Sequence, residues 1–377
     1  MDFGLSPEQE LLRGQARDFL DRASPSSAVR RALESDGGWD AAVWRQMVEL
    51  GWTAIPFSTE VGGLGLGLVE LAVVLEEQGR HLTPSPFHSS VCLAGAVTAA
   101  APDSPFQREL LGGIAAGSTR ATVALLESSG RWDAAGVRLR AELSGDAYRL
   151  RGEKLYVPDA RDADWIIVAA RTEEDAEDGV TLMAIDRGAP GVTVARLRSL
   201  DPTRNLARLG FDDVEVDVTR VLGTPGHGFS TLRRALDVAA VAVSAELCGV
   251  AQRAMELSVE HAKNRRQFGR PIGSYQAISH RCADMLVQVE SARSLTYHAA
   301  WALEHDQVAA PLAVSMAKAY AGDAARWVTS TAIQVHGGIG FTWEHDAHLL
   351  FKRAKWGEVM YGDGRHHRER VAQRLEL

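Results

Sequence analysis

The sequence has few cysteines, and they lie far apart. Cys92, Cys248 and Cys282 have neither the paired spacing of a zinc site nor that of a disulfide framework. No stretch approaches the roughly 18 consecutive apolar residues of a membrane span, and residues 1–20 lack the uninterrupted apolar segment of a secretory signal. We therefore expect a cytoplasmic protein without a membrane span or a metal site.

An excess of positive charge is also absent. The chain of 377 residues has a formal net charge of -8 and a pI near 5.9, whereas nucleic-acid binding needs clustered cationic charge. What the sequence does have is apolar residues, 46% of the total, enough for a large core divided over two or three domains. Small molecules and other proteins are the expected partners.

Helical patterns fill the chain up to about Gly117. Ser6, Pro7 and Gln9 form a capping-box start, with serine at the N-cap, proline at N1 and glutamine at N3. A second helix is expected to begin at Asp40 and to end before Gly51. The glycine-rich run 62–67 precedes an apolar-periodic segment, and we interpret it as a loop between helices because no strand comes before it.

Short β-rich runs replace the helical pattern between Arg120 and Gly228. Turn pairs such as Gly145-Asp146 and Pro190-Gly191 separate them. The runs expected to form strands are 121–126, 147–150, 154–157, 165–170, 181–185 and 214–218.

Long helical segments return after Phe229, over about 229–263, 275–304 and 309–335. Helices of this length are typical of a bundle that also makes oligomer contacts. The sequence thus predicts an α+β protein that is mainly α. Its expected parts are an N-terminal helical domain (1–118), a central β-domain (119–228) and a C-terminal helical bundle (229–377).

Three segments spread along the chain carry a family resemblance. They read GGLGLGLVELAVVLEEQGR at 62–80, AKNRRQFGRPIGSYQAISHRCADM at 262–285 and IQVHGGIGFTWEHDAHLLFKRAK at 333–355. The first resembles the N-terminal helical domain of acyl-CoA dehydrogenases, the second their R-x-x-F-G-x-P-I…Q signature, and the third their Q-x-x-G-G-x-G-x block. The resemblance implies non-covalently bound FAD and a C-terminal four-helix bundle that assembles as a tetramer.

The second segment implies contacts to FAD. Arg265 matches the position that meets the pyrophosphate, and a planar guanidinium suits a phosphate; the alternative is a surface arginine beside Arg266. Phe268 would pack against the adenosine half of the cofactor. Gln276 matches the glutamine of the same signature.

The third segment implies a close backbone approach. Gln334, Gly337 and Gly338 match the loop that approaches the FAD of a neighbouring subunit, where side chains would be in the way. The same region contains His336, His345 and His348, whose spacings of 9 and 3 residues lack the tight pairing of a helical zinc site. We expect these histidines to be structural.

The chain departs from the family where the flavin ring should lie. The family usually has Trp-Ile-Thr there, and this chain has Tyr156, Val157 and Pro158. The tyrosine can still cover the ring, but proline has neither a hydroxyl nor a backbone N–H for flavin N5. The family's T-E-P-x-A-G-S-D stretch keeps Glu127 and little else. These variants resemble a bacterial branch found in the catabolism of sterols and other bulky or branched acids.

Both usual positions of the family's catalytic base lack a carboxylate here. One lies just before Gly362 and is Tyr361, a poor base at neutral pH. The other lies on the helix before the R-x-x-F-G segment, and by spacing from Gly249 it falls on Ala239.

Glu246 is the candidate base. It lies seven residues after Ala239, on nearly the same helix face, and is the only charged residue from 238 to 252. An apolar pocket would raise its pKa toward the range useful for proton transfer. The alternative is a structural glutamate paired with an arginine across the bundle. Asp363, two residues after Tyr361, is a further candidate, although it better matches a position near FAD, and Glu358 lies one helical turn before Tyr361.

The leading hypothesis is α,β-dehydrogenation of an acyl-CoA thioester. A carboxylate takes the α-proton, the β-hydrogen leaves as hydride to the flavin, and the electrons pass to an electron-transfer flavoprotein. Two alternatives stay open. One is a non-catalytic or half-site subunit of a heterotetramer with a homologous chain, and the other is a flavin oxidase or monooxygenase on the same fold.

Overall fold

The structure is a computed structural model that describes residues 4–174 and 178–377. The chain forms two compact units, and each is built from segments that are distant in the sequence. The first comprises residues 1–34, 67–83 and 240–377, and the second comprises residues 35–66 and 84–239. The long helix α7 (Gly228–Asn264) contributes its first part to the second unit and the rest to the first.

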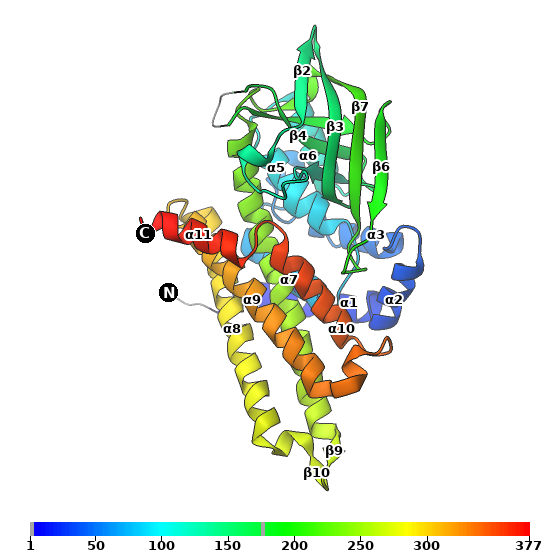
Figure 1. Cartoon of the computed structure of the whole chain (residues 1–377), viewed down its shortest axis with the longest axis vertical. Coiled ribbons are helices and arrows are strands. Elements are labelled where there is room, and N and C mark those ends of the chain that lie inside the picture. The colour runs from blue at the N-terminus through cyan, green and yellow to red at the C-terminus, as the bar shows by residue number, and fades with distance from the viewer. Residues whose placement is uncertain (1–3, 175–177) are drawn as a thin grey trace. The chain divides into compact units, whose positions relative to one another are not determined.

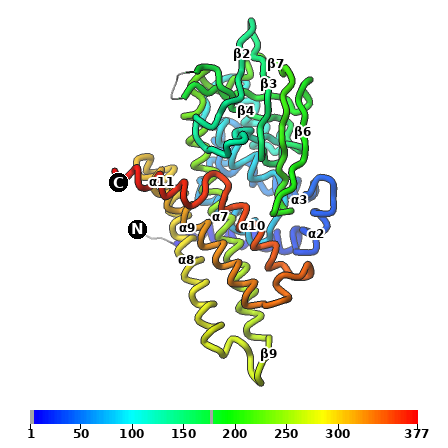
Figure 2. Tube along the Cα trace, viewed as in Figure 1, coloured from blue at the N-terminus to red at the C-terminus, as the bar shows by residue number. Residues whose placement is uncertain are grey.

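The first unit is a helical bundle. Helix α9 packs against α8, α10 and α11, and Figure 1 shows α8 and α9 in yellow and orange beside α10. Figure 2 follows the chain along α7, round the turn at β9, and back along α8. Besides α7, its elements are α1 (Pro7–Ala23), α2 (Ser26–Glu34), α4 (Leu68–Arg80), β9 (Arg266–Gln267), β10 (Arg270–Pro271), η6 (Ile272–Ser274), α8 (Gln276–His305), α9 (Ala310–His336), η7 (Gly337–Phe341), α10 (Ala347–Val359) and α11 (Gly364–Arg374).

The expected helix starts and lengths are confirmed for this unit. Helix α1 begins with the capping box of Ser6 and Gln9, and the three long C-terminal helices lie within one residue of the predicted bounds. The pattern missed α2, which is only nine residues long. By length and composition, α7 alone among the helices of the described residues could cross a membrane, but 89% of its apolar window is buried, as in a core helix.

The second unit contains an eight-stranded sheet in the order β6-β7-β3-β2-β4-β5-β8, with β1 parallel to β4. One face packs an apolar core that includes Leu150, Ile166, Met183 and Leu209. The strands are β1 (Ala121–Ala124), β2 (Arg140–Ser144), β3 (Ala147–Pro158), β4 (Trp165–Arg171), β5 (Val180–Asp186), β6 (Val192–Leu197), β7 (Leu206–Asp217) and β8 (Val221–Leu222).

All six expected β-runs fall on strands, and three strands were missed. Strand β2 is mostly polar and exposed, so it lacks the apolar signal on which the prediction rests. Strand β6 alternates exposed and half-buried residues over its first four positions, and β8 has only two residues. Gly145 and Asp146 form the two-residue turn that joins β2 to β3, since Ser144 pairs with Ala147.

The remaining elements of this unit are helical. Helix α3 (Ala41–Glu49) begins at its expected N-cap, Asp40. A π-helix, η3 (His88–Gly95), packs against β1. The others are η1 (Trp52–Ala54), η2 (Thr59–Val61), α5 (Ala96–Ala100), α6 (Pro105–Ala115), η4 (Ala134–Gly136) and η5 (Val218–Arg220).

Helices α4 and α7 meet backbone to backbone at two glycines of the first unit. A Cβ atom on Gly79 would lie 2.0 Å from the carbonyl oxygen of Glu246, and one on Gly249 would lie 1.8 Å from the carbonyl oxygen of Glu76. Real Cβ atoms do not approach backbone oxygens so closely. Only glycine on both helices therefore permits this crossing.

We expect Gly249→Ala to lower the free energy of unfolding by about 3 kcal/mol or more, because the added methyl forces two packed helices apart. The matched control is Gly14→Ala inside α1, where an added Cβ meets nothing within 4 Å. That change should stabilise the protein by about 0.5–1 kcal/mol through helix propensity. Urea unfolding measures both, and equal effects of the two variants would contradict the crossing.

Candidate functional site

One end of the helical bundle presents a tight hairpin. Helix α7 ends at Asn264, and β9 and β10 are joined by Phe268 and Gly269, which both have left-handed backbones (φ 51° and 81°). Phe268 is 92% exposed and meets the ring of Tyr275 edge-on, with the centroids 6.5 Å apart. Arg265 is exposed at the base of the hairpin, and Gln276 is the exposed first residue of α8.

A glycine turn lies at the same end. Helix α9 ends at His336, whose ring lies 4.6 Å from that of His261 near the end of α7. Gly337 follows with φ 66°, and an added Cβ on Gly337 or Gly338 would meet nothing within 4 Å. Gln334 is exposed.

The residues at this end fit a dinucleotide cofactor. A guanidinium suits a pyrophosphate, an aromatic ring that is almost fully exposed offers a stacking face, and side-chain-free backbone permits close approach. The structure thus brings six of the predicted cofactor residues to one end of the unit: Arg265, Phe268, Gln276, Gln334, Gly337 and Gly338.

The histidines beside the glycine turn are packed against each other. The rings of His336 and His345 are 4.3 Å apart, and His336 contacts the carbonyl oxygen of Ala332 through Nδ1. Burial, and then the neighbouring His336, lower the pKa of both His261 and His345. Among residues 4–174 and 178–377, no group of three or more His, Cys, Asp or Glu side chains could hold a metal ion.

In the second unit, Tyr156 stands out of the sheet at a bulge. The register between β3 and β7 shifts between Lys154 and Val157, and Tyr156 has φ 56° and a side chain that is 48% exposed. A bulge re-aims a side chain in this way. Val157 and Pro158 are buried, and the Pro158 carbonyl accepts a hydrogen bond from Thr122. Of Tyr156, Val157 and Pro158, only Tyr156 therefore has an exposed side chain.

Lys154 and Glu127 form a buried pair beneath this segment. The Lys154 Nζ donates to Glu127 Oε1 at 2.7 Å and to the Leu125 carbonyl at 3.0 Å. The backbone N–H groups of Arg138 and Leu139 also donate to Glu127. Burial lowers the pKa of Lys154 to about 8, and Glu127 opposes that shift. The glutamate retained from the family pattern therefore ties the loop before β2 to β3.

Glu246 is buried and paired with an arginine. Its side chain is 2% exposed, and its Oε2 lies 3.3 Å from the Nη1 of Arg353 on α10, which is 1% exposed. Arg353 also donates to the carbonyl of Leu82 at 3.4 Å. This partner is of the kind that the structural alternative predicts for Glu246.

Tyr361 lies in a strained turn between α10 and α11. It is buried, with φ 58°, and Gly362 follows with φ 100°. Lys318 of α9 donates to the carbonyls of Glu358 and Gly362, at 3.0 and 2.8 Å. His367 donates from Nε2 to the Tyr361 carbonyl at 3.0 Å. The buried side chains of Lys318 and His367 thus fix the backbone around Tyr361, the position at which the family has its base.

Burial disfavours the charged forms of Lys318 and His367. Burial lowers the pKa of Lys318 to about 7, against the opposing effect of Asp363. Burial, and then Lys318, lower the pKa of His367 to about 2. His367 is therefore a neutral donor at physiological pH.

Asp363 caps α11 by accepting a hydrogen bond from the N–H of His366. It lies near the Lys318 end of α9, whereas Gln334 lies about 24 Å further along that helix, given its rise per residue. The structure therefore does not bring Asp363 together with the glycine turn of the same copy. This separation fits the implied contact of the turn with a neighbouring subunit's cofactor.

Three residues of these sites were missed by the sequence analysis. Lys318 is the only charged residue in an apolar stretch of α9, and this pattern could have singled it out as Glu246 was singled out. Arg353 and His367 lie among other charged residues on α10 and α11, where the sequence carries no signal that they are buried.

Comparison with known proteins agrees with the fold over the whole chain. Residues 6–118, 122–214 and 226–376 match the N-terminal, middle and C-terminal domains of acyl-CoA dehydrogenase, respectively. The acyl-CoA dehydrogenase IpdE2 of Mycolicibacterium smegmatis is 34% identical over 375 residues, which cover 97% of this chain and 98% of that protein.

Solved structures give the same result. The ChsE4-ChsE5 complex from Mycobacterium tuberculosis has a chain that is 28% identical, with a TM-score of 0.91 and coverage of 100% of this chain and 99% of that one. The structure of the Tcur3481-Tcur3483 steroid ACAD contains a chain that is 30% identical to this one. The TM-score is 0.87, and the match covers 98% of each chain. This chain therefore belongs to the acyl-CoA dehydrogenase family of FAD-dependent oxidoreductases.

Proposed function

We propose that the chain takes part in the α,β-dehydrogenation of an acyl-CoA thioester and passes the electrons to an electron-transfer flavoprotein. The observation that carries this proposal is the end of the bundle where an arginine, an exposed aromatic ring and open glycine backbone lie together. We also propose a cytoplasmic location, in keeping with three cysteines that are all free thiols.

Bound FAD would supply a hydride acceptor at flavin N5. The chain's own part is to bind and orient. Arg265 would pair with the pyrophosphate, Phe268 would stack on the adenosine half, and Tyr156 would cover the flavin ring. Pro158 offers no N–H at its position, so any hydrogen bond to N5 has to come from another residue.

The acceptor of the α-proton has two candidates. One is Glu246, and the other is a carboxylate on a homologous partner subunit. The geometry favours the partner, because Glu246 is paired with the permanently charged Arg353 and is 2% exposed, so a substrate would have to break a buried ion pair to use it. The presence of tyrosine at position 361 supports the same choice.

The second candidate function is therefore a half-site subunit of a heterotetramer. This chain would contribute cofactor contacts, and the partner would contribute the base. Similarity over the full chain length to a member of the ChsE4-ChsE5 complex supports such an assembly. Similarity to the steroid ACAD supports a bulky, polycyclic acyl group as the substrate.

Arg265→Ala should reduce the FAD content of the purified protein on the order of tenfold, because a charge-assisted contact to the pyrophosphate is lost. Arg266→Ala is the matched control, since it removes an exposed arginine next in the chain. The flavin absorbance of the two variants after gel filtration measures the difference. Full retention in Arg265→Ala would exclude the pyrophosphate role.

The source of the base is tested by flavin bleaching with a panel of acyl-CoA thioesters under anaerobic conditions. If the base is on a partner, the chain alone should bleach slowly or not at all, and adding the homologous subunit should restore reduction. Bleaching by the chain alone that falls by orders of magnitude in Glu246→Gln would instead assign the base to Glu246. Oxygen uptake without an electron acceptor would indicate an oxidase.

A structural role for Glu246 predicts coupled effects on stability. Glu246→Gln and Arg353→Met should each lower the free energy of unfolding by about 3 kcal/mol or more, because each removes one member of a buried ion pair. The double variant should lose much less than the sum of the two. Additive losses, measured by urea unfolding, would show that the pair does not interact.

A further inference from the structure

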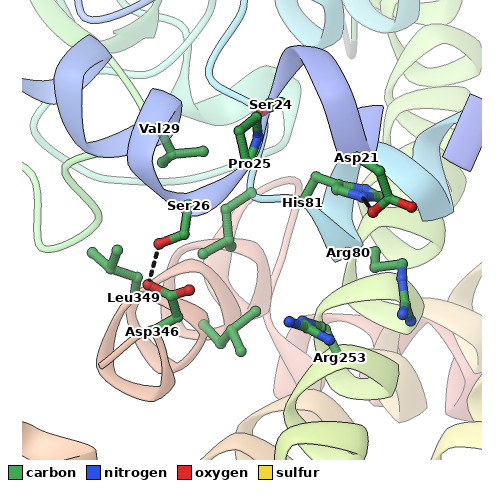
Figure 3. A pocket seen from close by; sticks show the side chains of 12 residues that line it. Asp21, Ser24, Pro25, Ser26, Val29, Arg80, His81, Arg253, Asp346 and Leu349 are labelled. Atoms are coloured by element: carbon green, nitrogen blue, oxygen red, sulfur yellow. Dashed lines mark hydrogen bonds and ion pairs between the residues drawn. The ribbon is translucent and has the colours of Figure 1, made fainter. Parts of the chain in front are cut away.

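A small cavity lies within the helical unit, away from the hairpin. Its walls come from the turn between α1 and α2, the end of α4, and parts of α7 and α10 (Figure 3). Its volume is about 210 Å³, below the range of about 300–1,000 Å³ typical of pockets for drug-sized ligands. An acyl-CoA molecule is therefore too large for it.

The floor of the cavity is apolar. Val29, Leu82, Leu349 and Leu350 line it, and each is at most 5% exposed. These side chains belong to the main apolar core of the unit, so the floor is fixed by packing. A ligand with a hydrocarbon body would gain from contact with this surface.

A cation in the wall lacks a matching anion. Arg253 approaches Glu256 only to 3.8 Å and makes no hydrogen bond to any residue that the structure describes. Both oxygens of Glu256 already accept from Arg80, at 2.7 and 2.6 Å, and one also accepts from Gln252. Two guanidinium groups therefore share one carboxylate, and the Arg253 guanidinium, whose side chain is 39% exposed, keeps its hydrogen-bond donors available at the cavity wall.

The other charges of the wall are satisfied. Asp21 contacts the Nε2 of His81 at 2.9 Å. Asp346 accepts from Ser26 and Arg30, both at 2.6 Å, and Figure 3 shows the bond from Ser26 to Asp346. Among the described lining residues, Arg253 is therefore the charged donor that makes only a long ion-pair contact and no hydrogen bond.

A serine hydroxyl also belongs to the wall of the cavity. Ser24 lines the cavity and is 3% exposed. Within residues 4–174 and 178–377, its hydroxyl forms no hydrogen bond. This hydroxyl is therefore available to a polar ligand atom that enters the cavity.

We propose that this cavity binds a short-chain, unesterified monocarboxylic acid. The fork of the Arg253 guanidinium would receive the carboxylate in bidentate geometry, and the alkyl chain would lie on the leucine and valine floor. Ser24 is available for a further polar atom. Inorganic phosphate has the charge but no hydrocarbon body, and an alcohol has the body but no charge.

The cavity is also joined to the buried pair of Glu246. Leu82, on the floor, has a left-handed backbone with φ 52°, and its carbonyl accepts from Arg353 at 3.4 Å. An acid bound on Leu82 would thus stabilise Leu82, whose carbonyl helps to hold Arg353 against Glu246. Binding should therefore raise the melting temperature of the whole protein.

The test is calorimetry and thermal unfolding of the purified, flavin-loaded protein with acetate, butyrate and hexanoate. Affinity should rise by about threefold to fourfold for each added methylene. Hexanol and inorganic phosphate should not bind. Arg253→Gln should weaken hexanoate binding on the order of tenfold or more, whereas Arg22→Gln, which removes an exposed cation outside the cavity, should leave it unchanged.

Ser24→Ala provides a second variant if Arg253→Gln does not fold, and it should weaken the binding of a hydroxy acid more than that of hexanoate. The proposal is overturned if hexanoate does not bind at millimolar concentration, if phosphate binds equally well, or if Arg253→Gln binds hexanoate like the wild type.

Discussion

The close contact of α4 with α7 determines the interior of the helical unit. Because Gly79 and Gly249 let the two backbones touch, Glu76 and Glu246 both lie at the crossing, where water is excluded. Each carboxylate then needs a cation from a surrounding helix. Arg293 of α8 and Tyr297 contact Glu76, both at 2.9 Å, and Arg353 of α10 contacts Glu246. The positions of α8 and α10 are thus coupled to one glycine contact.

The pairing of Glu246 with Arg353 changes how this acid in an apolar helix is interpreted. From the sequence, Glu246 resembles a base whose pKa is raised by burial, but its buried environment includes a permanent cation. The position that the family uses for its base is likewise fixed, by Lys318 and His367 acting on the carbonyls around Tyr361. Glu246 and Tyr361 are thus both held by buried structural contacts.

Much of the fold could be predicted from the sequence, because its signals are local. The capping box at Ser6, the long apolar periodicities after Phe229, and the Gly145-Asp146 turn each determine their own segment. The partners of Glu246 and Tyr361 could not be predicted. Arg353 lies 107 residues from Glu246 in a charged segment, and its burial depends on how α10 packs. The expected role of the exposed Phe268 follows only from the family resemblance, because nothing local requires an aromatic residue at a hairpin tip.

The central claim is that this chain holds the cofactor without supplying the proton acceptor. Its most direct test is mass spectrometry of α-deuterium uptake by an acyl-CoA thioester incubated with the protein in D2O, which reports proton abstraction independently of flavin reduction. The account predicts no uptake with the chain alone and uptake once the homologous subunit is added. Uptake with the chain alone that is abolished by Glu246→Gln would contradict it.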